Sequence, residues 1–489
     1  MAVADSWLDR LIAYLSPARG AQRLAARRAM DLLSYEGART GRREDGWIVG
    51  AGTSANAEIS STRQLLRDRA RQLRRDNAYA AKAVSVLVSN RIGTGIMAAA
   101  DGTNQRVNRR VNEGWERWID RCDFTGRTDY YGLQALAERA RIESGECFVR
   151  LAQVAAVDAD DVPLRLQVLE PDYLDSTRNE RRNGDVETRE GIEYTGGVPS
   201  AYWLFGSHPG DNAPLLRTSS QSTKVPARDV LHYYRADRPG QLTGVTELAP
   251  VIRRLYDLEG YADAELMRKK IAACSVGAVT SSGDLPGASL GPVSTASDGR
   301  RNEQIAPGMY HYFKPGESVE FFDPKPSDGY GEFFSVELHA ISAGLGIPYE
   351  LLTGDLSEVT YTSHRGGLVQ FRGAVEADQW QLVIPQLCNP IWRRFIFDSQ
   401  MVPGLRVPAR FTPPRFGLLD PAKEIPAMIA AIQGGLRSWT DTIRREGDDP
   451  GKVLDEIEAE RKELARRGVT LTSVPAVLDE PRSEESAAA

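Results

Sequence analysis

The chain has 489 residues, 41% of them hydrophobic and 26% charged, which is typical of globular domains and excludes a largely disordered or fibrous protein. Its formal net charge of −6 at pH 7 disfavours a protein that holds nucleic acid over its whole surface. No run of about 18 apolar residues is present, and the N-terminus contains the acidic residues Asp5 and Asp9 and an apolar stretch too short for a signal peptide. We therefore expect a cytoplasmic product without a membrane partner.

Cysteine and histidine spacing gives no support for a metal or cofactor site. The four cysteines lie far apart, without a CxxC pair: Cys122, Cys147, Cys274 and Cys388. None of the five histidines stands four residues from another or beside a cysteine. We therefore expect reduced, packed thiols and neither a bound metal nor a cofactor.

The first part of the chain predicts an arm followed by a long helix. The first 43 residues are rich in arginine and predict a partly helical arm that contacts something outside its own core. A mostly apolar stripe then recurs at alternating spacings of four and three and predicts one helix over residues 63–90. Its members are Leu66, Ala70, Leu73, Asn77, Ala80, Val84 and Leu87. Six arginines within the first thirteen residues of this helix lie mostly on its other faces and favour a solvated or salt-bridged surface.

The middle of the chain changes from strand-like runs to helices. Short runs of aromatic and β-branched residues between about 145 and 240 predict a small mixed or antiparallel β domain. Pro250 is expected to open a helix that runs to about Ala273. The Ser/Gly/Pro-rich segment 281–299 predicts an exposed tip or linker, followed by a short β-like return.

The remainder is predicted to be mainly helical. One helix covers about Glu332–Leu345, and a longer one runs from about His364 to Asp398, where Pro385 and Pro390 should kink it. A compact helical module follows, and the tail EPRSEESAAA is expected to be disordered.

Three glycine-rich motifs lack the context that their catalytic interpretation requires. GASLG at Gly287–Gly291 fits a nucleophile elbow but lies in the exposed tip instead of between a strand and a helix. IGTGIMA at Ile92–Ala98 resembles a shortened dinucleotide loop but follows a long helix, so a helix C-terminal turn is the better interpretation. GDDPGKV at Gly447 lacks the spacing and the Ser/Thr of a phosphate-binding loop.

The stretch TGDLSEVTYTSHRGGL, residues 353–368, gathers hydroxyl-bearing side chains around one histidine. Asp355, Ser363 and His364 are the residue types of a hydrolytic triad, and an alternative function, a nucleic-acid-processing or hydrolytic enzyme, rests on them. Hydroxyls in a loop are more often caps and turn formers, which is the interpretation that we favour.

An ordered series of phrases resembles the lambda family of phage portal proteins. It begins with RDRARQLRRDNAYAAKAVSVLVSNRIGTGI and continues through DFTGRTDYYGLQALAERARIESGECFVRL, LQVLEPDYLD, GIEYTGGVPSAYWLF and VPARDVLHYYRADRPGQLTGVTELAPVI. It ends with DLEGYADAELMRKKIAAC, ISAGLGIPYELLTGDLSEVTYTSHR and DPAKEIPAMIAAIQGGL. The resemblance covers about residues 5–470, and no single phrase carries it.

The resemblance implies an α+β, mainly helical portal fold that forms a ring, commonly of twelve subunits, around double-stranded DNA at one capsid vertex. The implied parts are an N-terminal basic arm (1–60), a wing (61–247), a first stem helix (248–273), a clip (274–328), a second stem helix (329–346), a tunnel loop with a long kinked helix returning to the wing (347–404), a helical crown (405–470) and a disordered tail (471–489). The implied partners are further copies of the chain, sliding DNA, the large terminase subunit, the major capsid and scaffold proteins and the head-tail connector proteins. Such a protein has no catalytic activity of its own and belongs to the virion, after assembly in the host bacterial cytoplasm.

The same resemblance implies three sets of functional residues. The candidate channel loop contains Ser357, Glu358, Thr360, Tyr361, Thr362, Ser363, His364 and Arg365. The candidate basic ring of the stem contains Arg268, Lys269 and Lys270, which could instead pair with Asp263 and Glu265. The candidate clip tip, for docking of the motor and the connectors, contains Asp284, Leu285, Leu290 and Val293.

Hydroxyls suit a channel loop because they make weak, exchangeable contacts, whereas each Lys or Arg contact with a phosphate adds affinity that must be broken at every step. Family members often have Asn-Tyr-Ser-Ser where this chain has Thr360–Ser363, a change that keeps the hydroxyls. Thr243 stands where an arginine is common, so an ion pair at the junction of wing and stem is not expected to carry over.

Overall fold

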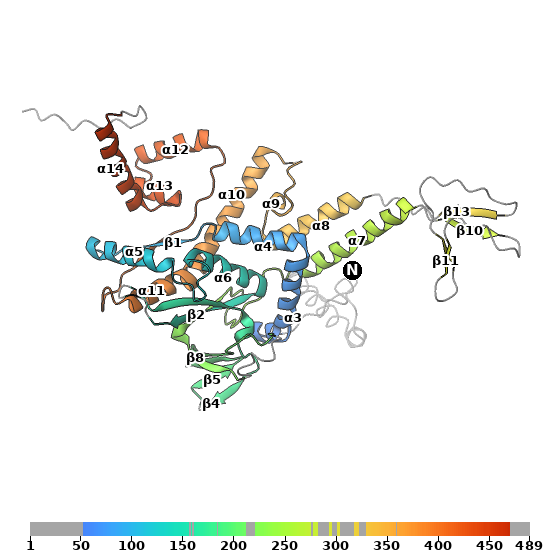
Figure 1. The fold of residues 1–489 in the computed structure, drawn as a ribbon, viewed down its shortest axis with the longest axis horizontal. Coiled ribbons are helices and arrows are strands. Elements are labelled where there is room, and N and C mark those ends of the chain that lie inside the picture. The colour runs from blue at the N-terminus through green and yellow to red at the C-terminus, as the bar shows by residue number, and fades with distance from the viewer. Residues whose placement is uncertain are drawn as a thin grey trace, which may run out of the picture. The chain divides into compact units, whose positions relative to one another are not determined.

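The computed structural model describes residues 52–155, 158, 161–182, 184–211, 221–274, 277–281, 293–295, 301–303, 317–321, 329–357 and 359–469. By its contacts the chain divides into two units, Met1–Glu58 and Ile59–Ala489, and the tertiary contacts described below lie within the second. Figure 1 shows helices and antiparallel sheets in this unit, which confirms an α+β, mainly helical fold. Among the described helices, none combines the length and the apolar character that crossing a bilayer requires.

The predicted helix over residues 63–90 is two helices, α3 (Ala55–Asp76) and α4 (Ala78–Arg91). They meet at Asn77, whose backbone is extended and whose side chain accepts a hydrogen bond of 3.0 Å from the Ala80 amide. The expectation of one continuous helix was wrong because Asn77 was counted in the packed stripe, although an asparagine side chain readily caps a new helix.

The arginines of α3 form the salt-bridged surface that the sequence predicted. Arg67 is buried and lies 3.2 Å from Glu146, while Arg71 lies 2.6 Å from Asp172. Three further ion pairs join Arg63 to Glu190, Arg74 to Glu143 and Arg75 to Asp76. Four of these five pairs fasten α3 to other segments of the chain, and that of Arg75 is with its neighbour in sequence.

Two antiparallel sheets confirm the predicted β domain. The first has the order β3-β2-β9, with β2 (Glu146–Gln153) between β3 (Leu164–Leu169) and β9 (Val230–Tyr234). The second has five strands in sequence order: β4 (Glu180–Arg182), β5 (Val186–Arg189), β6 (Ile192–Thr195), β7 (Val198–Leu204) and β8 (Thr223–Pro226). Phe148 of β2 and Tyr202 of β7 belong to the apolar cluster that joins the two sheets.

A second apolar cluster brings distant helices onto the first sheet. It contains α5 (Gln105–Ile119), α6 (Tyr130–Ser144) and α11 (Asn389–Ser399). Trp115 of α5 lies 4.9 Å from Trp392 and 5.0 Å from Phe395 of α11, measured between ring centroids. Strand β1 (Met97–Ala100), just before α5, pairs with β14 (Ala409–Thr412) at the edge of the same cluster.

Helices α7 (Ile252–Cys274) and α8 (Tyr330–Leu345) confirm two predicted helices and contact each other through Tyr261 and Tyr330, whose rings stack 5.5 Å apart. Two strand pairs lie between them in sequence, β10 (Gly277–Ser281) with β13 (Glu317–Phe321) and β11 (Val293–Thr295) with β12 (Arg301–Glu303). Strand β11, which was not predicted, falls inside the segment expected to be an exposed tip or linker. A Val-Ser-Thr run with two β-branched residues suits a strand.

The predicted long helix through Pro385 and Pro390 is three consecutive helical segments. They are α10 (Tyr361–Asp378), the π-helix η4 (Gln379–Cys388) and α11. The chain stays helical through both prolines, with Pro385 inside η4 and Pro390 in the first turn of α11. Pro385 lacks the N–H that an α-helix needs, and a π-helix, with its i to i+5 bonds, accommodates this local departure from α geometry.

The predicted C-terminal helical module consists of α12 (Pro421–Gln433), α13 (Trp439–Arg445) and α14 (Pro450–Arg467). In the GDDPGKV motif, Asp449 caps α14 by accepting a hydrogen bond from Gly451, so this motif opens a helix. IGTGIMA is the C-terminal turn of α4, as predicted, and leads into β1. GASLG lies outside the described residues. Cys122, Cys147 and Cys388 are buried free thiols, as expected.

Candidate channel loop and the ion network behind it

The loop between α9 (Tyr349–Thr353) and α10 is built from local hydrogen bonds to side chains. Gly354 takes the left-handed conformation (φ 76°) that ends α9. The Asp355 carboxylate then accepts hydrogen bonds from the amide and the hydroxyl of Ser357, at 3.0 and 2.7 Å. These bonds hold the pKa of Asp355 below its ordinary value. Glu358 lies outside the described residues.

Thr360 and Ser363 close the loop with a reciprocal cap on α10. The Thr360 hydroxyl accepts from the Ser363 amide at 3.3 Å, and the Ser363 hydroxyl accepts from the Thr360 amide at 3.2 Å. The two hydroxyl oxygens lie 2.9 Å apart, and the Ser363 hydroxyl also contacts the Thr360 carbonyl at 2.9 Å. The interpretation of these hydroxyls as caps and turn formers is confirmed.

The residue types of a hydrolytic triad are present in this loop but are not joined. Ser363 bonds to Thr360, and Asp355 bonds to Ser357. No hydrogen bond of the described residues links His364 to either of them, and His364 Nδ1 is buried without a hydrogen-bond partner there. A nucleophile needs its base within hydrogen-bond reach, and this arrangement lacks that contact.

The candidate residues from Tyr361 to Arg365 lie in the first turns of α10 and not in the loop before it. Thr362 is exposed, and Arg365 Nη2 lies 3.7 Å from Glu424 of α12. At this distance the ion pair between the start of α10 and the C-terminal helical module is weak.

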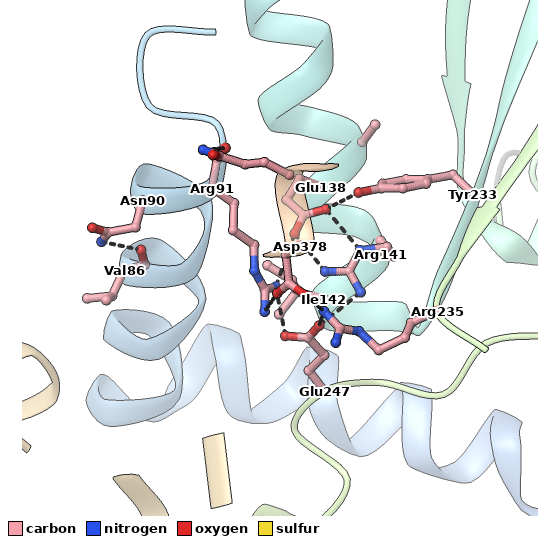
Figure 2. A network of polar contacts seen from close by, with 12 residues as sticks. Val86, Asn90, Arg91, Glu138, Arg141, Ile142, Tyr233, Arg235, Glu247 and Asp378 are labelled. Atoms are coloured by element: carbon pink, nitrogen blue, oxygen red, sulfur yellow. Dashed lines mark hydrogen bonds and ion pairs between the residues drawn. The ribbon is translucent and has the colours of Figure 1, made fainter. Parts of the chain in front are cut away.

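The far end of α10 is fixed by an ion network, shown in Figure 2. Asp378, the last residue of α10, lies 2.7 Å from Arg91 at the end of α4 and 2.7 Å from Arg235 after β9. Gln379, the first residue of η4, donates a 2.8 Å hydrogen bond to the Arg91 carbonyl. The change from α-helix to π-helix therefore occurs at the two residues, Asp378 and Gln379, that contact Arg91 of α4.

The centre of this network is the buried carboxylate of Glu138. It contacts Arg141 at 2.6 and 2.9 Å, Arg91 at 3.1 Å and the hydroxyl of Tyr233 at 2.5 Å. Burial alone would raise the pKa of Glu138, but the charges of Arg141 and Arg91 outweigh burial and lower it to about 2. The carboxylate is thus held ionised in a fully buried position.

Glu247 extends the network toward α7, which begins five residues later. Its carboxylate lies 2.9 Å from Arg91 and 2.9 Å from Arg141. Three cations, Arg91, Arg141 and Arg235, thereby face three anions, Glu138, Glu247 and Asp378, so the charges of the network balance. The network connects the helix that follows the candidate channel loop with the residues that precede α7.

The candidate stem residues are only partly free to form basic rings. Arg268 pairs with Glu265 one turn earlier, at 2.5 Å, which raises the pKa of Arg268. Lys269 lies 4.0 Å from Glu265 and 5.5 Å from the centre of the Tyr330 ring. Lys270 is exposed and has no ion pair among the described residues. Of the clip residues, Val293 begins β11, whereas Asp284, Leu285 and Leu290 lie outside the described residues.

One group of the described residues has ligand atoms close enough to hold a metal ion, namely Glu170, Asp172 and His208, within 4.8 Å of one another. Arg71 already contacts both carboxylates, at 3.1 and 2.6 Å, and His208 contacts Glu170 at 3.3 Å. The arginine supplies the positive charge that a cation would bring.

Comparison with known proteins identifies the family. The model of the phage portal proteins of the lambda family matches residues 40–379. The chain belongs to the lambda family of phage portal proteins. A probable portal protein of Halomonas phage phiHAP-1 is 28% identical to this family member over 466 residues, which cover 89% of this chain and 88% of the relative.

Two solved structures align with most of the chain at low sequence identity. A chain in the neck of a native gene transfer agent particle has a TM-score of 0.44 and 14% identity, and the match covers 78% of this portal family chain and 94% of the other. An HK97 family phage portal protein from Corynebacterium diphtheriae has a TM-score of 0.32 and 10% identity, covering 72% and 94%. Both TM-scores are below 0.5, so the family assignment depends on the sequence match alone.

The ion network was not predicted from the sequence. Its residues are spread between positions 91 and 378, and an ion pair between residues so far apart produces no pattern in the neighbouring sequence. One signal was present in ALAERARIE, where Glu138 and Arg141 stand three residues apart in line with the apolar positions Ala137 and Ile142. Charges on the apolar side of a helix indicate a buried pair, because an unpaired buried charge is too costly.

Proposed function

We propose that this chain is the subunit of a closed ring, commonly of twelve copies, at one vertex of a phage capsid, and that double-stranded DNA passes through the ring during packaging and ejection. Membership of the lambda portal family is the observation that carries this proposal. The ring would stand in the virion and would meet the major capsid protein, the scaffold, the large terminase subunit and later the head-tail connector proteins. It would assemble in the cytoplasm of the host bacterium.

Exposed apolar side chains on α7 and α8 support self-assembly. Tyr256 and Met267 of α7 are 71% and 57% exposed, and Phe333 and Val336 of α8 are 48% and 62% exposed. A groove of about 740 Å³ lies beside them, lined by Leu258, Tyr261 and Phe333 among others. Large apolar residues that gather on one pair of helices indicate a protein contact. Further copies of the chain would cover this surface in a ring.

The order of elements supports the proposed division of the chain. We assign the two stem helices to α7 and α8, the clip to the strand pairs between them, the wing to residues 61–247 and the crown to the module of α12, α13 and α14. We assign the tunnel loop to about residues 353–364, and α10, η4 and α11 to the long helix that returns to the wing. Contact of α11 with α5 agrees with that return.

The candidate loop suits a surface that DNA slides past. Ser357, Thr360 and Ser363 hold the loop in shape through local hydrogen bonds, so it needs no strong contact with DNA to stay ordered. Its hydroxyls can exchange weak contacts with passing phosphates, whereas a bore lined with arginine would bind each phosphate too tightly.

The first experiment is the mass of the purified protein by light scattering after size exclusion, with images of the same particles. One subunit has a mass of 53.8 kDa, so twelve give about 646 kDa. Annular particles of that mass support the proposal. A chain that stays monomeric when its capsid and scaffold proteins are also present contradicts it.

We also propose that the chain has no catalytic activity and that a separate terminase ATPase drives packaging. Ser363→Ala and His364→Ala test the alternative of a hydrolytic enzyme using Asp355, Ser363 and His364. An enzyme would lose turnover by orders of magnitude, whereas a channel loop should give normal rings with altered DNA packaging or retention. ATP hydrolysis by the purified ring that one of these variants abolishes would contradict the proposal.

The proposed clip tip has its own test. Shortening residues 281–299 should leave the mass of the ring unchanged and weaken binding of the terminase or of the connector proteins. Unchanged binding of both would show that the docking surface lies elsewhere.

A further inference from the structure

A concave surface, which we call the α5 basin, lies between α5 and the start of α14. It has a volume of about 830 Å³ and is also lined by β1 and β14. An ion pair of 2.5 Å between Glu116 of α5 and Lys452 of α14 spans it. The basin is separate from the candidate channel loop, whose residues do not line it.

Three arginines of α5 line the basin without an acidic partner. Arg106, Arg109 and Arg110 are exposed, and none of them forms an ion pair with any described residue. The arginines of α3 are different, because five of the six pair with an acidic side chain. The other cations beside these three include Arg410, paired with Asp101 at 2.6 Å.

The placement of these arginines opposes the stability of their own helix. They lie in the first half of α5, which has no acidic residue in its first turn. Positive charges near a helix N-terminus oppose the helix dipole, and like charges three or four residues apart repel each other. Trp115 and Trp118 of the same helix are buried, which requires polar residues at its exposed positions but not three cations. A ligand that neutralises them would remove this conflict.

Acidic residues also line the basin, but most of them are engaged. Asp101 and Glu116 form the ion pairs already described, and Asp449 accepts the hydrogen bond that caps α14. Glu113, Asp449 and Asp455 are then the acidic residues outside an ion pair, since an amide hydrogen bond leaves the charge of Asp449 in place, against the three arginines and Arg444. The unpaired charge of the basin is therefore positive, although the whole chain carries −6.

We propose that the α5 basin binds the phosphate backbone of double-stranded DNA. Three and four residues along a helix correspond to rises of about 4.5 and 6 Å, so the three guanidinium groups can reach successive phosphates of one strand. Guanidinium groups bind phosphate oxygens in pairs, which favours arginine over lysine at such a site. This binding would be independent of sequence and sensitive to salt. This DNA binding goes beyond the proposed channel function, because a single copy of the chain outside a ring could also bind DNA in this way.

The test compares two triple variants of the full-length protein at equal assembly state. Arg106→Gln, Arg109→Gln and Arg110→Gln together remove the basin charges. Arg69→Gln, Arg150→Gln and Arg393→Gln remove three exposed arginines, also without an ion pair among the described residues, from other surfaces. Binding to a fluorescent 30-base-pair duplex is measured by anisotropy over a range of NaCl concentrations.

The basin variant is expected to bind the duplex at least about tenfold more weakly at 0.1 M NaCl. Each lost phosphate contact reduces the slope of log K against log salt concentration by about 0.9, so three contacts give about 2.7. The control variant should keep the slope of the unmodified protein. Equal losses in the two variants overturn the proposal, because they would show only an effect of total charge.

Two further outcomes would also overturn it. If the basin variant changes the mass of the assembled protein while binding of the duplex is unchanged, the basin is a contact between copies of the chain. If a photocrosslinking residue in place of Gln105, on the wall of the basin, attaches to the acidic segment 471–489 and not to the duplex, that segment is the occupant. Attachment of the crosslinker to the duplex supports DNA as the ligand.

Discussion

Glu138 shows how one buried carboxylate can hold several segments together. Its two oxygens meet Arg91 of α4, Arg141 of its own helix and Tyr233 of β9. A buried charge or hydroxyl that loses its partner raises the free energy of the folded state, so these residues stabilise the fold only when all of them are present. Removing one member should therefore cost more than the loss of a single surface ion pair.

We predict that Glu138→Gln lowers the free energy of unfolding by about 3 kcal/mol near neutral pH, because two buried arginines lose part of their counter-charge. Chemical unfolding followed by circular dichroism measures this change. Glu463→Gln, in an exposed pair with Arg466 on α14, is the matched control and should leave the unfolding midpoint unchanged. A similar midpoint for the two variants would show that the buried network contributes little.

The pH dependence of stability follows from the same residue. The pKa of Glu138 falls from 4.5 to about 2 on folding, so its contribution is complete above about pH 4.5 and is lost as the pH falls toward 2. The pKa values of Glu146, Glu247 and Asp172 are lowered as well, which acts in the same direction. The unmodified protein should lose stability in this window, and Glu138→Gln should lose less. Parallel curves for both proteins would contradict this assignment.

At the scale of elements, the break between α3 and α4 depends on Asn77. Its side-chain oxygen caps α4, and its side-chain nitrogen donates a hydrogen bond of 3.2 Å to the carboxylate of Glu259 in α7. We predict that Asn77→Ala destabilises the protein by about 1 kcal/mol and speeds amide exchange in the first turn of α4. Asn77→Ser keeps a cap and should recover most of the loss. If serine is no better than alanine, the bond to Glu259 matters more than the cap.

The turn after α6 provides a second test at this scale. Gly145 has a φ of 91°, and a Cβ there would lie 2.7 Å from the backbone carbon of Val245. Gly145→Ala is therefore expected to destabilise the fold by about 2 kcal/mol or more, seen as a lower melting temperature or insoluble protein. Gly373→Ala, inside α10 with open space around it, is the control and should not reduce stability. Equal melting temperatures would show that the turn can rearrange.

The sequence predicted those elements whose signal is local. The strand runs around Phe148 and Tyr202 were found because aromatic and β-branched residues favour strands wherever the partner strand lies. The cap at Thr360 and Ser363 was expected from the chemistry of hydroxyls in loops. Asn77 was misjudged because its spacing fits the packed face of one long helix and its side chain also suits the N-cap of a new helix. The sequence pattern does not distinguish these two roles. The network around Glu138 was missed because its partners are set by tertiary packing.

At the scale of the whole molecule, the exposed apolar side chains of α7 and α8 form the surface that we propose for the contact between copies. We predict that Val336→Asp places a charge in the contact between copies, so that light scattering gives a mass near 53.8 kDa while circular dichroism is unchanged. Val198→Asp, at an equally exposed valine of strand β7, is the matched control and should assemble normally. Normal assembly of the Val336 variant would place the contact on another surface.

The length of the π-helix η4 also determines how the side chains of α11 are rotated about the helix axis relative to those of α10. Phe371 and Val375 of α10 pack in a cluster with α4 and α7, whereas Trp392 and Phe395 of α11 pack in the cluster with α5 and β2. In an α-helix each residue turns the following side chains by about 100°, so the number of residues in η4 determines which face of α11 meets its core. A single deletion within Gln379–Cys388 would rotate the tryptophan away from its cluster while leaving α10 in place. Among relatives of this chain, the length of this segment should therefore vary far less than that of the loops beside it.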